Sequence, residues 1–330
     1  MRPIRRILVA VKDPTARMPP GAAKAAQLSR ALGAELVLFH AISAPLCLEG
    51  DLSLLNHGLA AAERRIRTAC RDPLEGIVRR LQRKGVRAVC SVQWDYPVYE
   101  AIIREAVRVG ADLIVAGRHA GRHTAAGLLR LTDWELLRLS AVPVLLIKRA
   151  GVYRRPVVLA AVDPDHSYSK PARLDGQILR AGSVIARALG GTLHAVHAYV
   201  PLPLAVVSAG ALTDNEVARA QARSARIAGE KLERLLRQVG IAESPRHLIA
   251  RHPTDAIEQV AEQTRSSLVV MGAIARSGLK RLLIGNTAEK VLDHLTSDVL
   301  VIKPAGLIKR SPRTRRPLRY AMFRATPEHY

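Results

Sequence analysis

Residues 113–148 read LIVAGRHAGRHTAAGLLRLTDWELLRLSAVPVLLIK, and residues 268–303 read LVVMGAIARSGLKRLLIGNTAEKVLDHLTSDVLVIK. Each stretch opens with an apolar run that ends in glycine and closes with an apolar run that ends in lysine. The two stretches lie 155 residues apart, far more than the period of about 20–50 residues typical of solenoids. We therefore predict two domains of similar design, a first copy (residues 1–150) and a second copy (residues 151–304), followed by a tail (residues 305–330).

The repeat reaches back to the start of each copy. The sequence Arg-Ala-Leu-Gly at residues 30–33 returns at residues 187–190, each time followed by a strand-like run that contains a histidine, His40 or His197. Short runs rich in valine, isoleucine and leucine alternate with longer segments of helical period, which is typical of a parallel sheet covered by helices on both faces. The predicted fold class is therefore α/β, with two tandem doubly wound, Rossmann-like domains that form a pseudo-dimer.

The second copy allows its elements to be placed individually. We predict a long amphipathic helix at residues 214–239, which Gly240 ends. The strands expected in this copy are residues 157–162, 192–198, 247–250, 268–272 and 299–303. We further expect the last strands of the two copies to pair with each other.

Composition excludes several classes of protein. Hydrophobic residues make up 48% of the chain and charged residues 24%, which is ordinary for a globular protein with a substantial core. Aromatic residues are only 3%, too few for a module that stacks nucleic-acid bases on exposed rings. The chain has neither an apolar run long enough to span a bilayer nor an N-terminal signal, so we expect a cytoplasmic protein. Cys47, Cys70 and Cys90 lack the spacing of a disulfide framework or a zinc site.

The formal net charge of +23 has two sources. Part of it is spread over predicted helix faces, where a solvated helix normally carries charge. The concentrated part is the segment from Lys309 to Arg324, which holds seven lysines and arginines and no acidic residue. We expect this segment to be disordered. It is interpreted either as a solubilising tail or as a contact site for RNA, DNA or an anionic surface.

The two copies differ after their fourth strand. In the second copy Gly272 ends the strand and Gly285-Asn286-Thr287 stands where a helix would begin. Backbone amides at a helix start suit phosphate oxygens, and the helix dipole adds a favourable partial charge. The cations Arg276, Lys280 and Arg281 lie in the connecting loop. By itself, however, this pattern is equally compatible with a simple helix start capped by Asn286 and Glu289.

In the first copy this pattern is lost. Arg130 and Leu131 stand where the second copy has its closing glycine and asparagine. Thr132 and Glu135 still predict a capped helix start. We therefore expect a helix without a phosphate site.

The spacing in the second copy resembles the Gly-x2-Gly-x9-Gly motif, followed by a small polar pair, of ATP-binding universal stress proteins. The chain as a whole is similar to tandem members of that family, particularly the bacterial E type. Two segments favour this type, Gly285 to Leu295 in the second copy and Thr132 to Arg138 in the first. The resemblance implies an adenine nucleotide alpha hydrolase-like fold, with ATP, and Mg²⁺ with it, bound to the second copy.

The resemblance also assigns roles to individual positions. Asp163 would contact the adenine edge, and Ala275 departs from the family by replacing its second glycine. If that position needs a positive φ, alanine costs about 1 kcal/mol and narrows the phosphate cradle. Lys12 takes the position of Asp163 in the first copy, where we expect no ATP. The other implied contacts, from the base through the ribose to the outer phosphates, are Ala198, Tyr199, Met271, Gly272, Gly285, Asn286 and Thr287.

No residue pattern indicates a dedicated catalyst or a metal site. His119 and His123 lie in a basic, glycine-containing loop without carboxylates or thiolates. His194 and His197 should point to opposite faces of their strand, with His197 a packed and hydrogen-bonded core residue. We expect a stress-adaptation protein that works by binding its ligand. Slow ATP hydrolysis is compatible with the resemblance, although no residue is identifiable as its base.

Two alternative functions stay open. The apolar loop segments at residues 45–55 and 201–212 could enclose a groove between the domains that binds or carries an apolar, lipid-like ligand, or they could pack across the domain interface. The basic tail could associate with RNA. Assembly of two chains into a homodimer is open as well.

Overall fold

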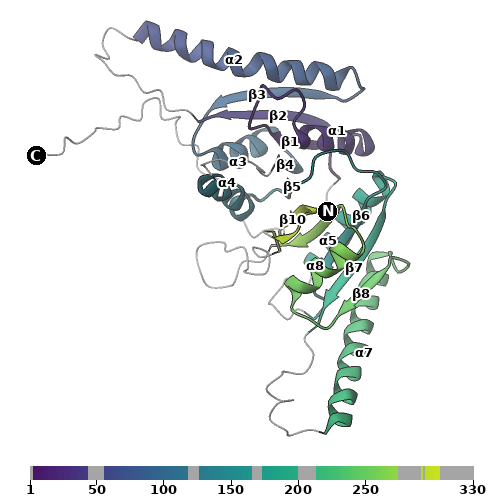
Figure 1. Ribbon diagram of the computed structural model, residues 1–330. Helices are drawn as coiled ribbons and strands as arrows, with labels where there is room; N and C mark the ends of the chain where they lie inside the picture. Colours follow the sequence, from purple (N-terminus) through teal and green to yellow (C-terminus); the bar gives the residue numbers. More distant parts are fainter. Residues whose placement is uncertain are drawn as a thin grey trace, which may run out of the picture.

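The computed structural model describes residues 3–43, 56–117, 126–165, 173–199, 213–273, 291–292 and 294–304 (Figure 1). The elements of the first copy are β1 (Arg6–Ala10), α1 (Pro20–Leu32), β2 (Glu35–Ile42), α2 (Asn56–Gln82), β3 (Ala88–Trp94), α3 (Val98–Val109), β4 (Leu113–Gly117), α4 (Ala126–Leu139) and β5 (Val144–Ile147). Those of the second copy are β6 (Val157–Val162), α5 (Arg173–Ala188), β7 (Thr192–Ala198), α7 (Asp214–Val239), β8 (Arg246–Ile249), α8 (Pro253–Gln263), β9 (Leu268–Gly272) and β10 (Asp298–Ile302).

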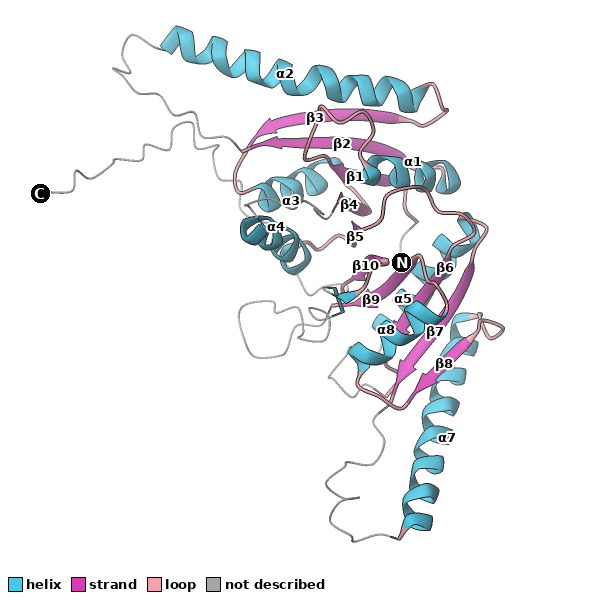
Figure 2. Ribbon diagram, in the orientation of Figure 1, coloured by secondary structure: helices cyan, strands magenta, loops and turns pink. Residues whose placement is uncertain are grey.

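All ten of these strands belong to one sheet, in the order β3-β2-β1-β4-β5-β10-β9-β6-β7-β8 (Figure 2). Neighbouring strands are parallel within each copy. At the centre β5 and β10 run antiparallel, with Leu145 opposite Leu300, which confirms the predicted pairing of the last strands. Three of the five strands predicted in the second copy have the observed bounds, and β8 and β10 begin and end one residue earlier.

Both faces of the sheet are covered by helices, as predicted. One core contains side chains from α1, α2, α5 and α7, and the other contains side chains from α3, α4, α8 and the helical residues Val291 and Leu292. Each core includes residues of both copies. Because the strands are buried on two faces, they need continuous apolar runs, and these runs made the repeat visible in the sequence.

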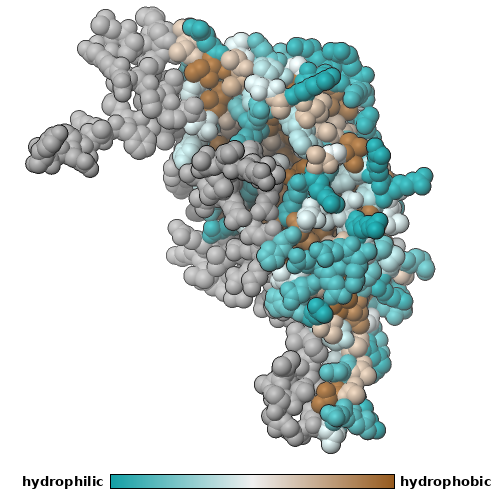
Figure 3. All heavy atoms as spheres, viewed as in Figure 1, coloured by the Kyte–Doolittle hydropathy of each residue, from teal (hydrophilic) through white to brown (hydrophobic). Residues whose placement is uncertain are grey.

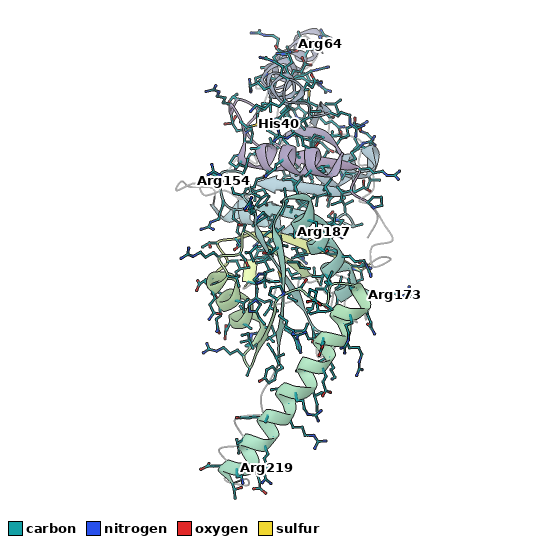
Figure 4. All side chains as sticks on the ribbon, turned by 90° about the vertical axis from the view of Figure 1, so that its right-hand side faces the viewer. His40, Arg64, Arg154, Arg173, Arg187 and Arg219 are labelled. Carbon is teal, nitrogen blue, oxygen red and sulfur yellow. The ribbon has the colours of Figure 1, made fainter. Side chains whose placement is uncertain are left out.

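Helix α7 begins at a capping box between Thr213 and Glu216 and ends at Gly240, whose φ is 76°. Only Ala228, Leu232 and Leu236 of this helix are buried. Its apolar stripe therefore packs against the rest of the protein only in the second half of the helix. The first half projects beyond the sheet (Figure 1), and its surface mixes hydrophilic with apolar residues (Figure 3). Arg219 on α7 and Arg64 on α2 mark opposite ends of the molecule (Figure 4).

The predicted start of α4 was wrong. Thr132 and Glu135 do not cap this helix, because it begins at Ala126, and Glu135 pairs instead with Arg138 at 2.8 Å. The residues between Ala126 and Thr132 are mostly leucine, alanine and arginine, which are strong helix formers. The helix therefore extends backwards through the positions where the second copy has its phosphate-loop motif.

A buried polar group, the junction cluster (Lys24, Tyr153 and Asp298), connects the copies. Lys24 on α1 forms an ion pair with Asp298 at the start of β10, and the two residues are 3% and 0% exposed. The Tyr153 hydroxyl donates to Asp298 Oδ2 at 2.6 Å, and the Lys24 ammonium lies 4.7 Å from the centre of the tyrosine ring. The amides of Lys148 and Arg149 donate to Asp298 Oδ1 at 2.8 and 3.1 Å. The carboxylate is thus fully surrounded by donors.

The junction cluster occurs once, although the repeat would allow a second, equivalent cluster with the roles of the two copies exchanged. The position equivalent to Asp298 in the first copy is Pro143, and the position equivalent to Lys24 in the second copy is Ala181. Buried ion pairs add little net stability compared with apolar pairs, but they specify which groups can meet. The cluster therefore specifies which residues of the first copy meet which residues of the second copy at the junction.

Two lysines make reciprocal contacts across the same junction. Lys148 Nζ, after β5, donates to the carbonyls of Leu292 and Leu295 in the second copy. Lys303 Nζ, after β10, donates to the carbonyls of Arg138 and Ser140 in the first copy, at 2.7 Å each. Each lysine thus satisfies carbonyl groups at the end of a helix in the other copy. This explains why both apolar runs end in lysine.

We predict that Lys24→Met lowers the free energy of unfolding by about 3–5 kcal/mol, because it leaves the buried Asp298 carboxylate without its counter-charge. Urea denaturation measures this loss. Arg226→Met is the matched control, since it breaks an exposed ion pair with Glu230 and should change stability by about 0.5 kcal/mol or less. Equal, small losses in both variants would contradict the prediction.

Lys303 should make stability depend on pH. Burial lowers its pKa from 10.5 to about 7, so between these values the unfolded chain binds more protons than the folded chain. The free energy of unfolding therefore rises with pH across this window. We expect Lys303→Met to flatten the rise in urea denaturation series at several pH values. Lys84→Met, at an exposed lysine, should keep the slope of the parent, and an unchanged slope in Lys303→Met would refute the assignment.

Candidate functional site

The candidate site lies at the carboxyl ends of β9, β6 and β7. Strand β6 pairs with β7 on one side and with β9 on the other. Helix α5, which follows β6, and the helical residues Val291 and Leu292, which follow β9, belong to cores on opposite faces of the sheet. In open α/β sheets, such a reversal of strand order leaves a crevice where ligands bind. The structure brings together five of the predicted site residues at this edge, namely Asp163, Ala198, Tyr199, Met271 and Gly272.

Asp163 is half-buried directly after β6. Its amide donates to Asp175 Oδ1 at 3.0 Å, and Asp175, in the first turn of α5, is 1% exposed. Asp163 Oδ2 is a buried atom without a hydrogen-bond partner in the described part of the chain. A buried acceptor of this kind is costly unless a donor meets it. The geometry therefore fits a ligand that presents an N–H or O–H group.

Two backbone amides beside the crevice already donate hydrogen bonds inside the protein. Tyr199 N–H donates to the Ile249 carbonyl at 3.0 Å, and Ala273 N–H donates to the Ile302 carbonyl at 2.9 Å. A ligand beside Ala198 and Tyr199 would therefore meet side chains and carbonyl groups rather than these amide hydrogens.

Met271 and Gly272 contribute mainly through packing. Met271 is 4% exposed and belongs to the core beneath the sheet. A Cβ atom on Gly272 would lie 2.7 Å from Leu174 Cδ2, so a larger residue there would displace the side chain of Leu174 on α5. Gly272 was predicted as a nucleotide contact, and packing against α5 is a second reason for a glycine at this position. At Gly117, the equivalent in the first copy, no described atom lies within 4 Å of such a Cβ.

The other predicted contacts lie outside the described residues. Ala275 is the second position of the motif and Arg276 is the cation in the loop that follows it. The closing turn consists of Gly285, Asn286 and Thr287. The same holds for the histidines of the basic loop, the apolar loop segments and the basic tail. Their assignments stay predictions.

Three residues near the crevice make contacts with one another that no local sequence pattern predicts. They form the β6-loop cluster (Asp165, His197 and Lys231). His197 Nε2 lies 3.0 Å from Asp165 Oδ2, and Lys231 Nζ lies 2.6 Å from Asp165 Oδ1. Burial alone would raise the pKa of Asp165, but hydrogen bonds and charge from Lys231 and His197 lower it on balance. His197 is 1% exposed, as predicted for a packed and hydrogen-bonded histidine.

The equivalent place in the first copy has different chemistry. Burial lowers the pKa of Lys12, while the charge of Asp133 on α4 acts in the opposite direction. Asp133 is thus close enough to act on the lysine that replaces Asp163. His40, the counterpart of His197, bonds through Nδ1 to the Val11 carbonyl at 2.8 Å. The first copy therefore provides internal partners where the second has a carboxylate oxygen without a partner among the described residues.

His194 points to the face of the sheet opposite His197, as predicted, and meets His247 on β8. The two rings lie nearly in parallel planes, with His194 Nδ1 and His247 Nε2 3.0 Å apart. Burial lowers the pKa of both histidines, and the charge of His194 further lowers the pKa of His247. The pair therefore favours its neutral form, in which one ring donates to the other.

Other surfaces of the described residues offer less chemistry. No group of three or more histidine, cysteine, aspartate or glutamate side chains there could hold a metal ion. No helix among them is long and apolar enough to cross a membrane. Cys70 and Cys90 are free, half-buried thiols, and burial raises the pKa of each. A groove of about 890 Å³ lies at the opposite edge of the sheet, between Pro3 and Ile4 of the first copy and the ends of α5 and α7.

Comparison with known proteins gives consistent matches. The profile of the universal stress protein family matches residues 3–148 and 156–303. Universal stress protein E of Escherichia coli K12 is 31% identical over 226 residues, which cover 67% of this chain and 69% of that protein. Its namesake in Photorhabdus laumondii is 30% identical over 232 residues, covering 67% and 71%. The structure of a universal stress protein from Pseudomonas aeruginosa UCBPP-PA14 matches with a TM-score of 0.63 at 27% identity, covering 91% of this chain and 94% of that one.

The histidine pair predicts a loss of stability in mild acid. Because the folded pKa values lie below the ordinary value of 6.5, the contribution of the pair is complete above about pH 6.5 and is lost as the pH falls. We expect His247→Gln to lose less stability than the parent between pH 7 and pH 5, as measured by thermal unfolding. His294→Gln removes an exposed histidine and should follow the parent. Parallel curves for all three proteins would rule out the pair as the source.

Proposed function

Because the chain belongs to the universal stress protein family, we propose that its second copy binds an adenine nucleotide, ATP together with Mg²⁺, and acts in stress adaptation by binding. The main support is the asymmetry between the copies. Only the second copy combines the glycine motif from Gly272 to Thr287 with an acidic residue at the end of its first strand, Asp163. The buried Asp163 Oδ2 without a described partner is the observation that carries the proposal.

The chemistry of this oxygen suits adenine. The exocyclic amino group of the base presents N–H donors, and the Asp163 carboxylate is an acceptor with one oxygen that has no partner in the described part of the chain. The base would lie beside Ala198 and Tyr199, with the ribose near the backbone of Met271 and Gly272. Gly285, Asn286 and Thr287 would hold the phosphates through amides at a helix start. Mg²⁺ would neutralise phosphate charge there.

The proposed mechanism is a shift between conformations. Bound nucleotide would stabilise one arrangement of the loops at the carboxyl edge of the sheet, and partner proteins would read that arrangement. The proposed mechanism uses no nucleophile and no general base. Ala275 at the second glycine position lowers the affinity we expect by about 1 kcal/mol if that position requires a positive φ.

Isothermal titration calorimetry with ATP and Mg²⁺ tests this function. We expect saturable binding in the parent, loss of binding in Gly285→Asp through repulsion of phosphate, and at least about tenfold weaker binding in Asp163→Ala, as for a lost buried hydrogen bond to a charged group. Arg130→Asp is the matched control, since it places the same charge at the equivalent position of the first copy. It should bind like the parent.

The absence of binding in the parent would overturn the nucleotide proposal. Organic extraction of the purified protein followed by mass spectrometry would then test the apolar-ligand alternative. Salt-sensitive RNA binding that disappears on deletion of residues 309–330 would instead favour the basic tail.

A further inference from the structure

The loop after β6 carries Asp163 and is anchored on two sides. At its start the amide of Asp163 donates to Asp175 on α5. Two residues further on, Asp165 accepts from His197 on β7 and from Lys231 on α7. Three different elements therefore fix a segment of three residues, and Asp163 stands at its beginning.

The first copy serves as an internal control for this arrangement. Superposing the repeat places His40 opposite His197, Pro14 opposite Asp165 and Gly76 opposite Lys231. Proline has no carboxylate to accept hydrogen bonds as Asp165 does, and glycine has no ammonium group to donate one as Lys231 does. His40 bonds a backbone carbonyl instead. Only the copy that retains the glycine motif thus has the β6-loop cluster. A purely architectural role would be required equally in both copies, because both fold into the same strands and helices.

We propose that Asp165, His197 and Lys231 are positioning residues that hold the loop after β6, and with it the Asp163 carboxylate, in the conformation that recognises the base of the nucleotide. This inference rests on the proposed nucleotide function of the second copy. The three residues act through Asp163, and none of them is placed in contact with the ligand.

The energetic reason is preorganisation. A loop that is ordered before the ligand arrives loses less conformational entropy on binding, so more of the interaction energy appears as affinity. The same rigidity supports selectivity, because a fixed carboxylate accepts from the amino group of adenine but repels the carbonyl oxygen that guanine has at that position. A mobile loop could move the carboxylate away from guanine and discriminate less.

The members of the cluster should contribute unequally. The side chain of His197 is 1% exposed and that of Asp165 is 21% exposed, whereas that of Lys231 is 43% exposed. A half-exposed ion pair is screened by water and contributes little by itself. We therefore expect Asp165 and His197 to fix the loop and Lys231 to tie it to α7.

The test combines three measurements on full-length variants. Calorimetry with ATP and with GTP gives affinity and selectivity, hydrogen exchange gives the mobility of residues 163–165 without ligand, and thermal unfolding shows whether each variant is folded. We expect Asp165→Asn to bind ATP about tenfold more weakly, to discriminate less between ATP and GTP, and to exchange faster in this segment. Lys231→Met should show about a threefold weaker affinity, and Lys231→Arg should restore it.

The outcomes separate this inference from the function on which it rests. If the parent binds ATP and Asp163→Ala weakens binding, but Asp165→Asn keeps the affinity and selectivity of the parent, the positioning role is overturned and the nucleotide function stands. If the parent binds no adenine nucleotide, both are overturned. A loss of affinity with unchanged selectivity and unchanged exchange would mean that the loop keeps its order without the cluster, and would also overturn the positioning role.

Discussion

The ion pair between Lys24 and Asp298 is the constraint on which the arrangement of the two copies depends. The pair is buried, so each partner needs the other, and the amides of Lys148 and Arg149 add donors from the end of β5. A displacement of one copy relative to the other would separate charges in a medium of low polarity. The antiparallel pairing of β5 and β10 supplies the apolar part of the junction, and the cluster supplies its register.

Much of the fold was predictable because the strands are buried on both faces. Such strands need continuous apolar runs, and a run such as residues 268–272 leaves little freedom in where a strand begins and ends. The duplicated design also fixed the number of domains and the pairing of the last strands. Helix α7 was equally clear, because its apolar stripe predicts a helix and Gly240 marks its end.

The sequence was less informative where contacts depend on loops or on residues far apart in the chain. Thr132 and Glu135 have the spacing of a capping box, yet the leucine-rich segment before them extends α4 past it. The β6-loop cluster joins residues from a loop, a strand and a helix, which no local pattern connects. It could have been found by comparing the copies position by position, since Pro14 and Gly76 replace two of its members. For half of the candidate contacts, including Ala275 and Gly285, the sequence motif is the sole basis of the prediction, because these residues lie outside the described part of the chain.

The central position of β10 has a consequence for synthesis of the chain. Strand β5 emerges from the ribosome roughly 150 residues before its neighbour β10, which at about 5–20 residues per second corresponds to roughly 8–30 s. Throughout this interval the nascent first half has an open, apolar sheet edge and a lysine on α1 whose acidic partner has not yet been made. Unpaired edges of this kind are templates for aggregation. Joining two domains through their last strands therefore exposes the growing polypeptide to aggregation at the edge of β5. Chaperones at the ribosome would have to bind this edge until β10 has been made.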